Sequence, residues 1–191
     1  FRYYKKALEL DNKNLTAVFN LAGMYITNRN EQAAIQLLTT YIERSPKDAG
    51  LYARLGDAYF ASKDIDKAIT TYERCLKLSP NYVGIAAKLG TLYSIHNRFV
   101  DAERMFQAAS KQDPKNAQMF ANLSSLYLAN GKPDQAISAA KSALQIKPTS
   151  DVYVTLGNAY HQMNDSKNAV IAYQRAIDLG STDPDIKKYV K

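Results

Sequence analysis

Cysteine and tryptophan are nearly missing from this chain. Of its 191 residues, one is a cysteine, Cys75, and none is a tryptophan. A single thiol cannot form an intrachain disulfide, and no cluster of cysteines and histidines has the spacing of a zinc site. The sequence therefore predicts neither a disulfide-bonded scaffold nor a zinc-binding domain.

Residue patterns that would support catalysis are also missing. The two histidines, His96 and His161, fall in different parts of the chain, too far apart to share a metal ion. No nucleophile–base pair, paired-carboxylate cleft or glycine-rich phosphate loop can be found. We therefore predict that this segment is not an enzyme and that it binds no cofactor and no metal.

The chain has no long hydrophobic run. No stretch approaches the roughly 18 apolar residues that a membrane-spanning helix requires, and no signal peptide is present. We expect no direct membrane insertion and a cytoplasmic location. A chain that opens inside a predicted helix without Met is expected to be a segment of a longer protein. The bacterial periplasm is therefore the alternative location, if an anchor or signal precedes Phe1.

Dense positive charge is lacking as well, although the net charge is +7 and the pI is about 9.3. Lysines and arginines alternate with acidic residues, no basic run of five exists, and no aromatic residues interleave with arginines. This distribution is typical of a solvated surface. It argues against nucleic-acid binding and leaves room for a preference for acidic partners.

An internal repeat dominates what the sequence does contain. Tyrosine recurs at a nearly constant interval, at Tyr25, Tyr59, Tyr93, Tyr127 and Tyr160. A leucine precedes each tyrosine by four positions, at Leu21, Leu55, Leu89, Leu123 and Leu156. An alanine follows each tyrosine by nine positions, at Ala34, Ala68, Ala102, Ala136 and Ala169. Such self-similarity is the signature of a linear array of small structural units.

The second unit shows the motif most completely. It reads L-Y-A-R-L-G-D-A-Y-F from Leu51, followed by Ala68, Tyr72, Cys75 and Pro80. This pattern, at a period of about 34 residues, resembles the tetratricopeptide repeat family. The resemblance covers nearly the whole chain and implies an all-α fold, a right-handed α-solenoid superhelix of antiparallel helix pairs. It divides the chain into the second helix of a preceding truncated repeat (1–14), five repeats (15–48, 49–82, 83–116, 117–149 and 150–183) and the start of a further or capping helix (184–191).

Helical periodicity predicts two helices in each unit. In the second unit, apolar residues at intervals of three and four predict a first helix over about 50–62 and a second helix over about 65–78. Asp64, Asn30 and Asp165 are expected to be N-caps of second helices, and Pro80 prevents the second helix from continuing. One such hairpin cannot bury its apolar faces alone, so each unit must pack against the next.

Some positions depart from the repeat pattern. Ala22 and Ser124 replace the usual glycine, while Ala140 replaces a larger residue that is Leu38, Tyr72, Phe106 or Tyr173 elsewhere. We expect larger and smaller residues at these positions to compensate for each other across a shared interface. The leucine, alanine and tyrosine series are expected to be core residues, with Cys75 as a buried structural thiol.

The resemblance also implies where a partner would bind. In this family the second, fifth, ninth, twelfth and thirteenth residues of each unit point into a concave groove. On this chain, the resemblance implies a groove lined mainly by small and apolar residues. The candidate partner contacts are Phe19, Ile26, Asp57, Phe60, Thr91, Gln118, Leu128, Asn158 and His161. The alternative is that bulky residues such as Phe19 and Phe60 pack on a neighbouring first helix and support the coiling of the array.

Two known kinds of groove do not match. Chaperone-binding members hold a terminal carboxylate with Lys or Arg at the fifth position and Asn at the ninth, and no unit here has that pair. Some sugar-transferase arrays carry an asparagine ladder at the sixth position. This chain has Asn20 and Asn122 there, but Arg54, Lys88 and Thr155 interrupt the ladder.

The sequence therefore predicts a protein–protein interaction module that binds a peptide or helix of a partner in its groove. One alternative is a scaffold that self-associates through open ends or the groove. Another is the recruiting arm of a larger glycosyltransferase or of a bacterial envelope or polysaccharide-export protein, which rests on analogy because a fold does not determine a function.

Overall fold

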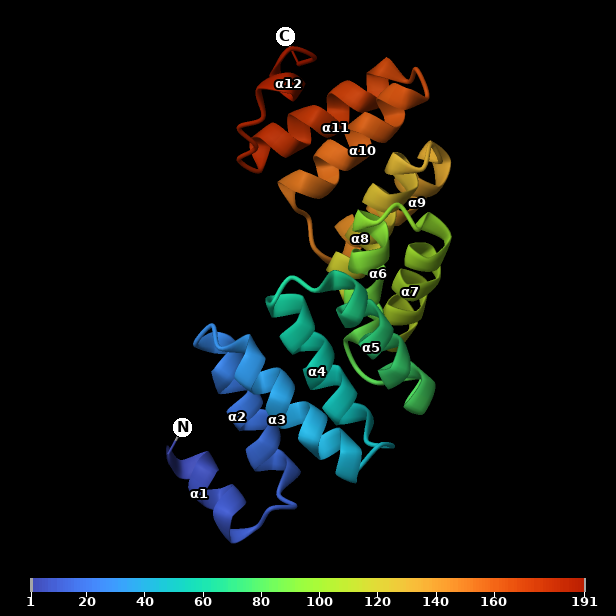
Figure 1. Cartoon of the computed structure of the whole chain (residues 1–191). Coiled ribbons are helices and arrows are strands. Elements are labelled where there is room, and N and C mark those ends of the chain that lie inside the picture. Colours follow the sequence, from blue (N-terminus) through green and yellow to red (C-terminus); the bar gives the residue numbers. More distant parts are fainter. Residues whose placement is uncertain (1, 191) are drawn as a thin grey trace. The chain divides into compact units, whose positions relative to one another are not determined.

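The computed structural model describes residues 2–190, and every regular element in that range is a helix (Figure 1). The chain divides into two compact units at the junction of Ile85 and Ala86, here called the amino-terminal and carboxy-terminal units. The helices are α1 (Arg2–Leu10), α2 (Leu15–Thr27), α3 (Glu31–Arg44), α4 (Ala49–Ala61), α5 (Ile65–Leu78), α6 (Ile85–Ile95), α7 (Phe99–Gln112), α8 (Ala117–Ala129), α9 (Pro133–Ile146), α10 (Ser150–Gln162), α11 (Ser166–Asp178) and α12 (Pro184–Lys187).

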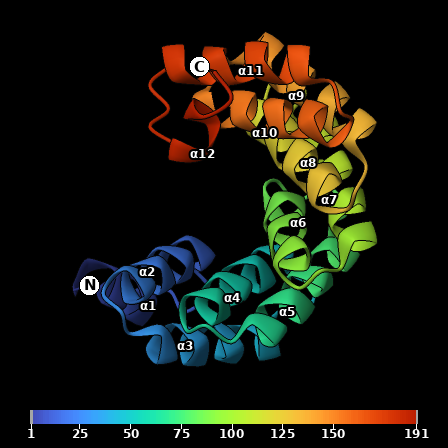
Figure 2. The same ribbon diagram turned by 90° about the horizontal axis from the view of Figure 1, so that it is seen from above.

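Consecutive helices form pairs inside each unit. Helices α4 and α5 lie side by side in the amino-terminal unit, as do α8 with α9 and α10 with α11 in the carboxy-terminal unit (Figure 2). The sequence prediction for the second helix of the second unit is confirmed at both ends, and the first helix lies one residue earlier than predicted. The all-α, paired-helix architecture predicted from the sequence is therefore confirmed.

A tight turn separates the two helices of each pair. Its pivot residue has a left-handed backbone conformation, with φ of 57° at Arg29, 65° at Lys63, 57° at Asn97, 66° at Gly131 and 60° at Asn164. The next residue donates its backbone N–H to the carbonyl of the repeat tyrosine, for example Asp64 N to Tyr59 O at 2.9 Å. This is the Schellman arrangement, which satisfies a carbonyl at the end of a helix that would otherwise have no partner.

The residue that closes this turn also begins the second helix. The side chains of Asn30, Asp64 and Asp165 accept hydrogen bonds from the backbone N–H three residues later, at 3.3, 3.3 and 3.1 Å. The three predicted N-caps are thus confirmed. Each turn therefore ends one helix and starts the next within two residues.

The repeated leucines and alanines form the core of both units. All five leucines are buried, as are all five alanines of the series. Tyr93 and Tyr127 are buried, whereas Tyr25, Tyr59 and Tyr160 are half-buried. Cys75 is fully buried between helices, as predicted.

Glycines bring the paired helices close together where the second helix carries an aromatic ring. A Cβ atom on Gly90 would lie 2.6 Å from Cδ1 of Phe106. A Cβ atom on Gly56 or Gly157 would lie about as close to the ring of Tyr72 or Tyr173, respectively. In the pairs that lack this glycine, the opposite residue is smaller or aliphatic. Ala22 lies in one core cluster with Leu38, and the buried hydroxyl of Ser124 donates to the carbonyl of Ala136 at 2.8 Å, in the pair that carries Ala140. The expected compensation across the interface is therefore present.

Candidate partner-binding surface

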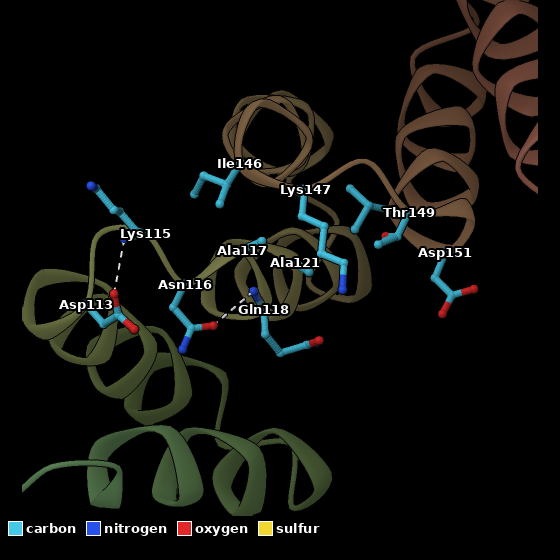
Figure 3. A pocket seen from close by; sticks show the side chains of 11 residues that line it. Asp113, Lys115, Asn116, Ala117, Gln118, Ala121, Ile146, Lys147, Thr149 and Asp151 are labelled. Atoms are coloured by element: carbon cyan, nitrogen blue, oxygen red, sulfur yellow. Dashed lines mark hydrogen bonds between the residues drawn. The ribbon is translucent and has the colours of Figure 1, made fainter.

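Helix α8 presents a hollowed first-helix face in the carboxy-terminal unit. A cavity of about 620 Å³, here called the α8–α10 cavity, opens beside the amino-terminal half of α8 (Figure 3). Its lining comes from the turn before α8, the end of α9 with the turn that follows it, the amino-terminal part of α8 and the first turn of α10. The residues are Asp113, Lys115, Asn116, Ala117, Gln118, Ala121, Ile146, Lys147, Thr149, Asp151 and Val152.

A second cavity lies further along the same helix. This α6–α8 cavity has a volume of about 320 Å³, and its residues come mainly from α6 and α8. They are Thr91, Ser94, Ile95, Phe106, Asn122, Ser125, Leu126 and Ala129. Small hydroxyl-bearing side chains face this space together with Ile95, whose side chain is 69% exposed. Such a lining can accept an apolar side chain and can also hydrogen-bond to a main chain.

One hydrogen bond on α8 links the two cavities. The Nε2 atom of Gln118, in the α8–α10 cavity, donates to Oδ1 of Asn122, in the α6–α8 cavity, at 2.9 Å. Residues four apart lie on one face of a helix, so the bond runs along the surface of α8. The two side-chain amides therefore form a polar ridge between two hollows.

On the corresponding face of the amino-terminal unit, the ring of Phe19 fills part of the space. Cζ of Phe19 on α2 lies 3.0 Å from the place that a Cβ on Gly50 would occupy, so its ring packs on the next first helix, α4. Phe19 and Ile26 both pack against the core cluster of this unit and are half-buried. Phe19 therefore packs on a neighbouring first helix, which is the contact that the alternative expectation named for it. Phe60 differs from it, because its side chain is 52% exposed.

Two polar residues at the ninth position accept hydrogen bonds from the second helix of their pair. The hydroxyl of Tyr72 donates to Asp57 Oδ1 at 2.6 Å, and that of Tyr173 donates to Asn158 Oδ1 at 2.8 Å. Arg54 lies 3.6 Å from Asp57 Oδ2. Burial raises the pKa of the Tyr72 hydroxyl well above its ordinary value of 10.0, and the hydrogen bond to Asp57 raises it further. The side chains of Asp57 and Asn158 are thus fixed in orientation by the tyrosine hydroxyls.

The predicted contact His161 lies beside the carboxy-terminal segment. The ring of Tyr189 meets the ring of His161 edge-on at 5.2 Å and stacks on the ring of Tyr173 at 5.3 Å. Ile186 of α12 is buried in the same cluster. This segment therefore covers part of the last helix pair.

The structure separates the predicted contacts into groups. Gln118 lines the α8–α10 cavity and Thr91 lines the α6–α8 cavity, whereas Leu128 is half-buried and lines neither. Sequence reasoning did not identify Lys147 and Asn116, which lie in turns outside the repeat's groove positions. Their place in loops just before first helices was the only available signal.

Among the residues that the structure describes, no three or more His, Cys, Asp or Glu side chains are grouped so that they could hold a metal ion. Among the helices of residues 2–190, none is both long and apolar enough to cross a membrane.

Comparison with known proteins identifies the family. Two models of the tetratricopeptide repeat match the chain, one over residues 26–74 and 59–126, the other over residues 117–150 and 150–179. The chain belongs to the tetratricopeptide repeat family. The resemblance seen in the sequence is thereby confirmed, and the helix pairs described above are tetratricopeptide repeats.

Solved tetratricopeptide structures share the fold. YrrB, described as "a TPR protein with an unusual peptide-binding site", has a TM-score of 0.85 and 18% identity, over 97% of this chain and 96% of YrrB. A crystal structure of MamA has a TM-score of 0.80 and 21% identity, over 85% of this chain and 90% of that one. MamA from Desulfovibrio magneticus RS-1 has a TM-score of 0.79 and 19% identity, over 86% and 93% of the two chains. No curated protein matches the chain significantly.

Proposed function

We propose that this chain is a protein–protein interaction module that binds a peptide or helix of a partner on its first-helix face, with α8 as the main contact. The observation that carries the proposal is the pair of cavities along α8, joined by the Gln118–Asn122 hydrogen bond. Two hollows separated by a polar ridge suit a segment that places side chains in the hollows and main-chain amides on the ridge. YrrB, with the same fold, is described as having a peptide-binding site.

An extended segment fits this surface better than a helix. The ridge carries free hydrogen-bonding capacity, since Gln118 Oε1 and Asn122 Nδ2 are not used in their mutual bond. A helix satisfies its own main-chain groups and would leave these amides unpaired, at a cost of about 1–3 kcal/mol for each group buried without a partner. An extended main chain can bond to both.

A selection from a displayed peptide library tests the proposal. Peptides retained by the unaltered chain should lose at least about tenfold in affinity with Ser125→Arg, which puts a long cation into the α6–α8 cavity. Ser138→Arg is the matched control, because Ser138 is an exposed serine on the second helix α9 and lines neither cavity. Peptides that bind both variants equally well, or a library from which nothing is retained, would contradict the proposal.

Self-association is the second candidate. Helix α1 has no buried residue, and its Tyr3 and Leu10 side chains are 89% and 81% exposed. Light scattering at two protein concentrations distinguishes the candidates, since a mass that stays that of one chain at high concentration excludes a self-associating scaffold. We further propose that the segment is not itself an enzyme. We also propose that it acts in the cytoplasm, and fractionation of the source cells tests this location.

A further inference from the structure

Three side-chain oxygen atoms of the α8–α10 cavity accept hydrogen bonds from within the chain. Oδ1 of Asp113 accepts from the backbone N–H of Lys115 at 3.2 Å, within its own turn. Oδ1 of Asn116 accepts from the backbone N–H of Gln118 at 3.2 Å, and Oδ1 of Asp151 accepts from the Ser150 hydroxyl at 3.3 Å. Each of these three acceptor groups therefore has at least one partner within the chain.

The donors of the same cavity are not used in this way. Within residues 2–190, neither Lys115 nor Lys147 has an ion-pair partner. Nδ2 of Asn116 and the second Nε2 proton of Gln118 have no acceptor among the described residues. Figure 3 shows the Lys147 and Gln118 side chains extending toward the same opening, while Asp113 is turned toward the main chain of Lys115. Lys147 thus brings an ammonium group without an ion-pair partner to the end of the cavity where Asp151 also lies.

The rest of the wall is apolar. Ala117, Ala121 and Val152 line the cavity beside Ile146, whose side chain is 40% exposed. Such a surface accommodates the methylene groups of a side chain while the donors bind its polar end. A ligand with a short aliphatic stem and an anionic, acceptor-only head matches this lining.

We propose that the α8–α10 cavity receives an acidic side chain, Asp or Glu, of the partner's extended segment, with Lys147 as its principal contact. This inference rests on the proposed function and specifies the chemistry of the partner. A charge-assisted hydrogen bond from an ammonium to a carboxylate is about twice as strong as a neutral one. The net charge of +7 also favours the approach of an acidic segment.

Asp151 provides a second test of the proposal, because its carboxylate also lines the cavity. A carboxylate brought near Lys147 is repelled by Asp151, so this residue weakens the binding of an acidic side chain. Lys147 and Asp151 should therefore act in opposite directions on the same ligand. A merely structural role of either residue does not predict that pattern.

The test is an NMR titration of the isotope-labelled chain with the peptide acetyl-Ala-Glu-Ala-amide, which needs no knowledge of the natural partner. The Glu peptide should shift the side-chain amide signals of Asn116 and Gln118, and the corresponding Gln peptide should do so about fivefold more weakly or not at all. Lys147→Met should reduce the affinity for the Glu peptide by about fivefold or more, and Asp151→Asn should raise it. Lys111→Met, an exposed lysine of α7 outside the cavity, is the matched control.

Each result supports or overturns the inference. Equal shifts with the Glu and Gln peptides, or an unchanged affinity in Lys147→Met, would overturn it, and so would an equal response to inorganic phosphate. The proposed function is tested separately by the library selection. Selected peptides whose binding is lost in Ser125→Arg but which show no preference for acidic residues would support the interaction module and contradict the proposed contact with an acidic side chain.

Discussion

Helix α2 of the amino-terminal unit and helix α8 of the carboxy-terminal unit differ at the fifth position of the repeat. Helix α2 has Phe19 there, whose ring packs on Gly50 of the next first helix. The carboxy-terminal unit has Ala121 at that position, and a cavity of about 620 Å³ lies beside it. The ring of Phe19 joins neighbouring first helices, whereas Ala121 lies beside open space. The two helices therefore differ in whether this position is packed or open.

The largest effect that tests this comparison is expected for Phe19→Ala. Removing a half-buried ring that fills the space above Gly50 should lower the free energy of unfolding by about 2–4 kcal/mol. Phe60→Ala, at an exposed position of the same unit, should cost less than about 1 kcal/mol. Urea denaturation measures both. Equal costs would mean that Phe19 does not support the unit.

The tyrosine hydroxyls should distinguish the units at the ninth position. Tyr72→Phe removes a hydrogen bond to a carboxylate and should cost about 1.5–3 kcal/mol. Tyr173→Phe removes a bond to a neutral amide and should cost about 0.5–1.5 kcal/mol. If the order is reversed in denaturation experiments, the charge on Asp57 is not what strengthens the first bond.

The same tyrosines predict how stability depends on pH. Burial raises the pKa of Tyr72 and Tyr173 above the ordinary value of 10.0, because the folded chain disfavours their ionised forms. Their contribution to stability is therefore complete below about pH 10 and is lost as pH rises beyond it, since the unfolded chain releases these protons first. We expect the free energy of unfolding to fall above about pH 10 and to fall less steeply in Tyr72→Phe. An equal slope in the variant would contradict this.

Within the helices, replacing a glycine should lower stability only where the glycine faces an aromatic ring. Gly90→Ala places a Cβ against Phe106 and should cost about 1–3 kcal/mol. Gly23→Ala is the control from the other unit, because no atom lies within 4 Å of its added Cβ. It should be neutral or stabilise α2 by up to about 1 kcal/mol, the difference in helix propensity. If both variants lose stability, the contact with the Phe106 ring is not the reason for the loss in Gly90→Ala.

The smallest change in stability is expected for Ala121→Phe, which gives α8 the ring that α2 carries. The new side chain enters an existing cavity, so the free energy of unfolding should change by less than about 1 kcal/mol. Binding of the peptides selected from the library should nevertheless be lost. If the variant unfolds, the cavity is less spacious than the structure indicates; if it still binds, the cavity is not the site.

The sequence alone was enough for the architecture, because the fold depends on a repeated local pattern. The leucine and alanine series recur once in every repeat, and each member is buried. The N-caps Asn30, Asp64 and Asp165 could be recognised as well, since a cap is made within three residues of the helix start. Local spacing and side-chain type suffice for such features, and the family follows from them.

Only the tertiary structure decided which groove positions are open. Phe19 and Phe60 have the same side chain, yet one packs on the next helix and the other is exposed, because only Phe19 faces Gly50 across the interface between helices. Lys147 and Asn116 lie outside the groove pattern, and the folding of their turns against α8 places them around a cavity. Contacts between residues distant in sequence depend on how neighbouring repeats pack, which the repeat period does not encode.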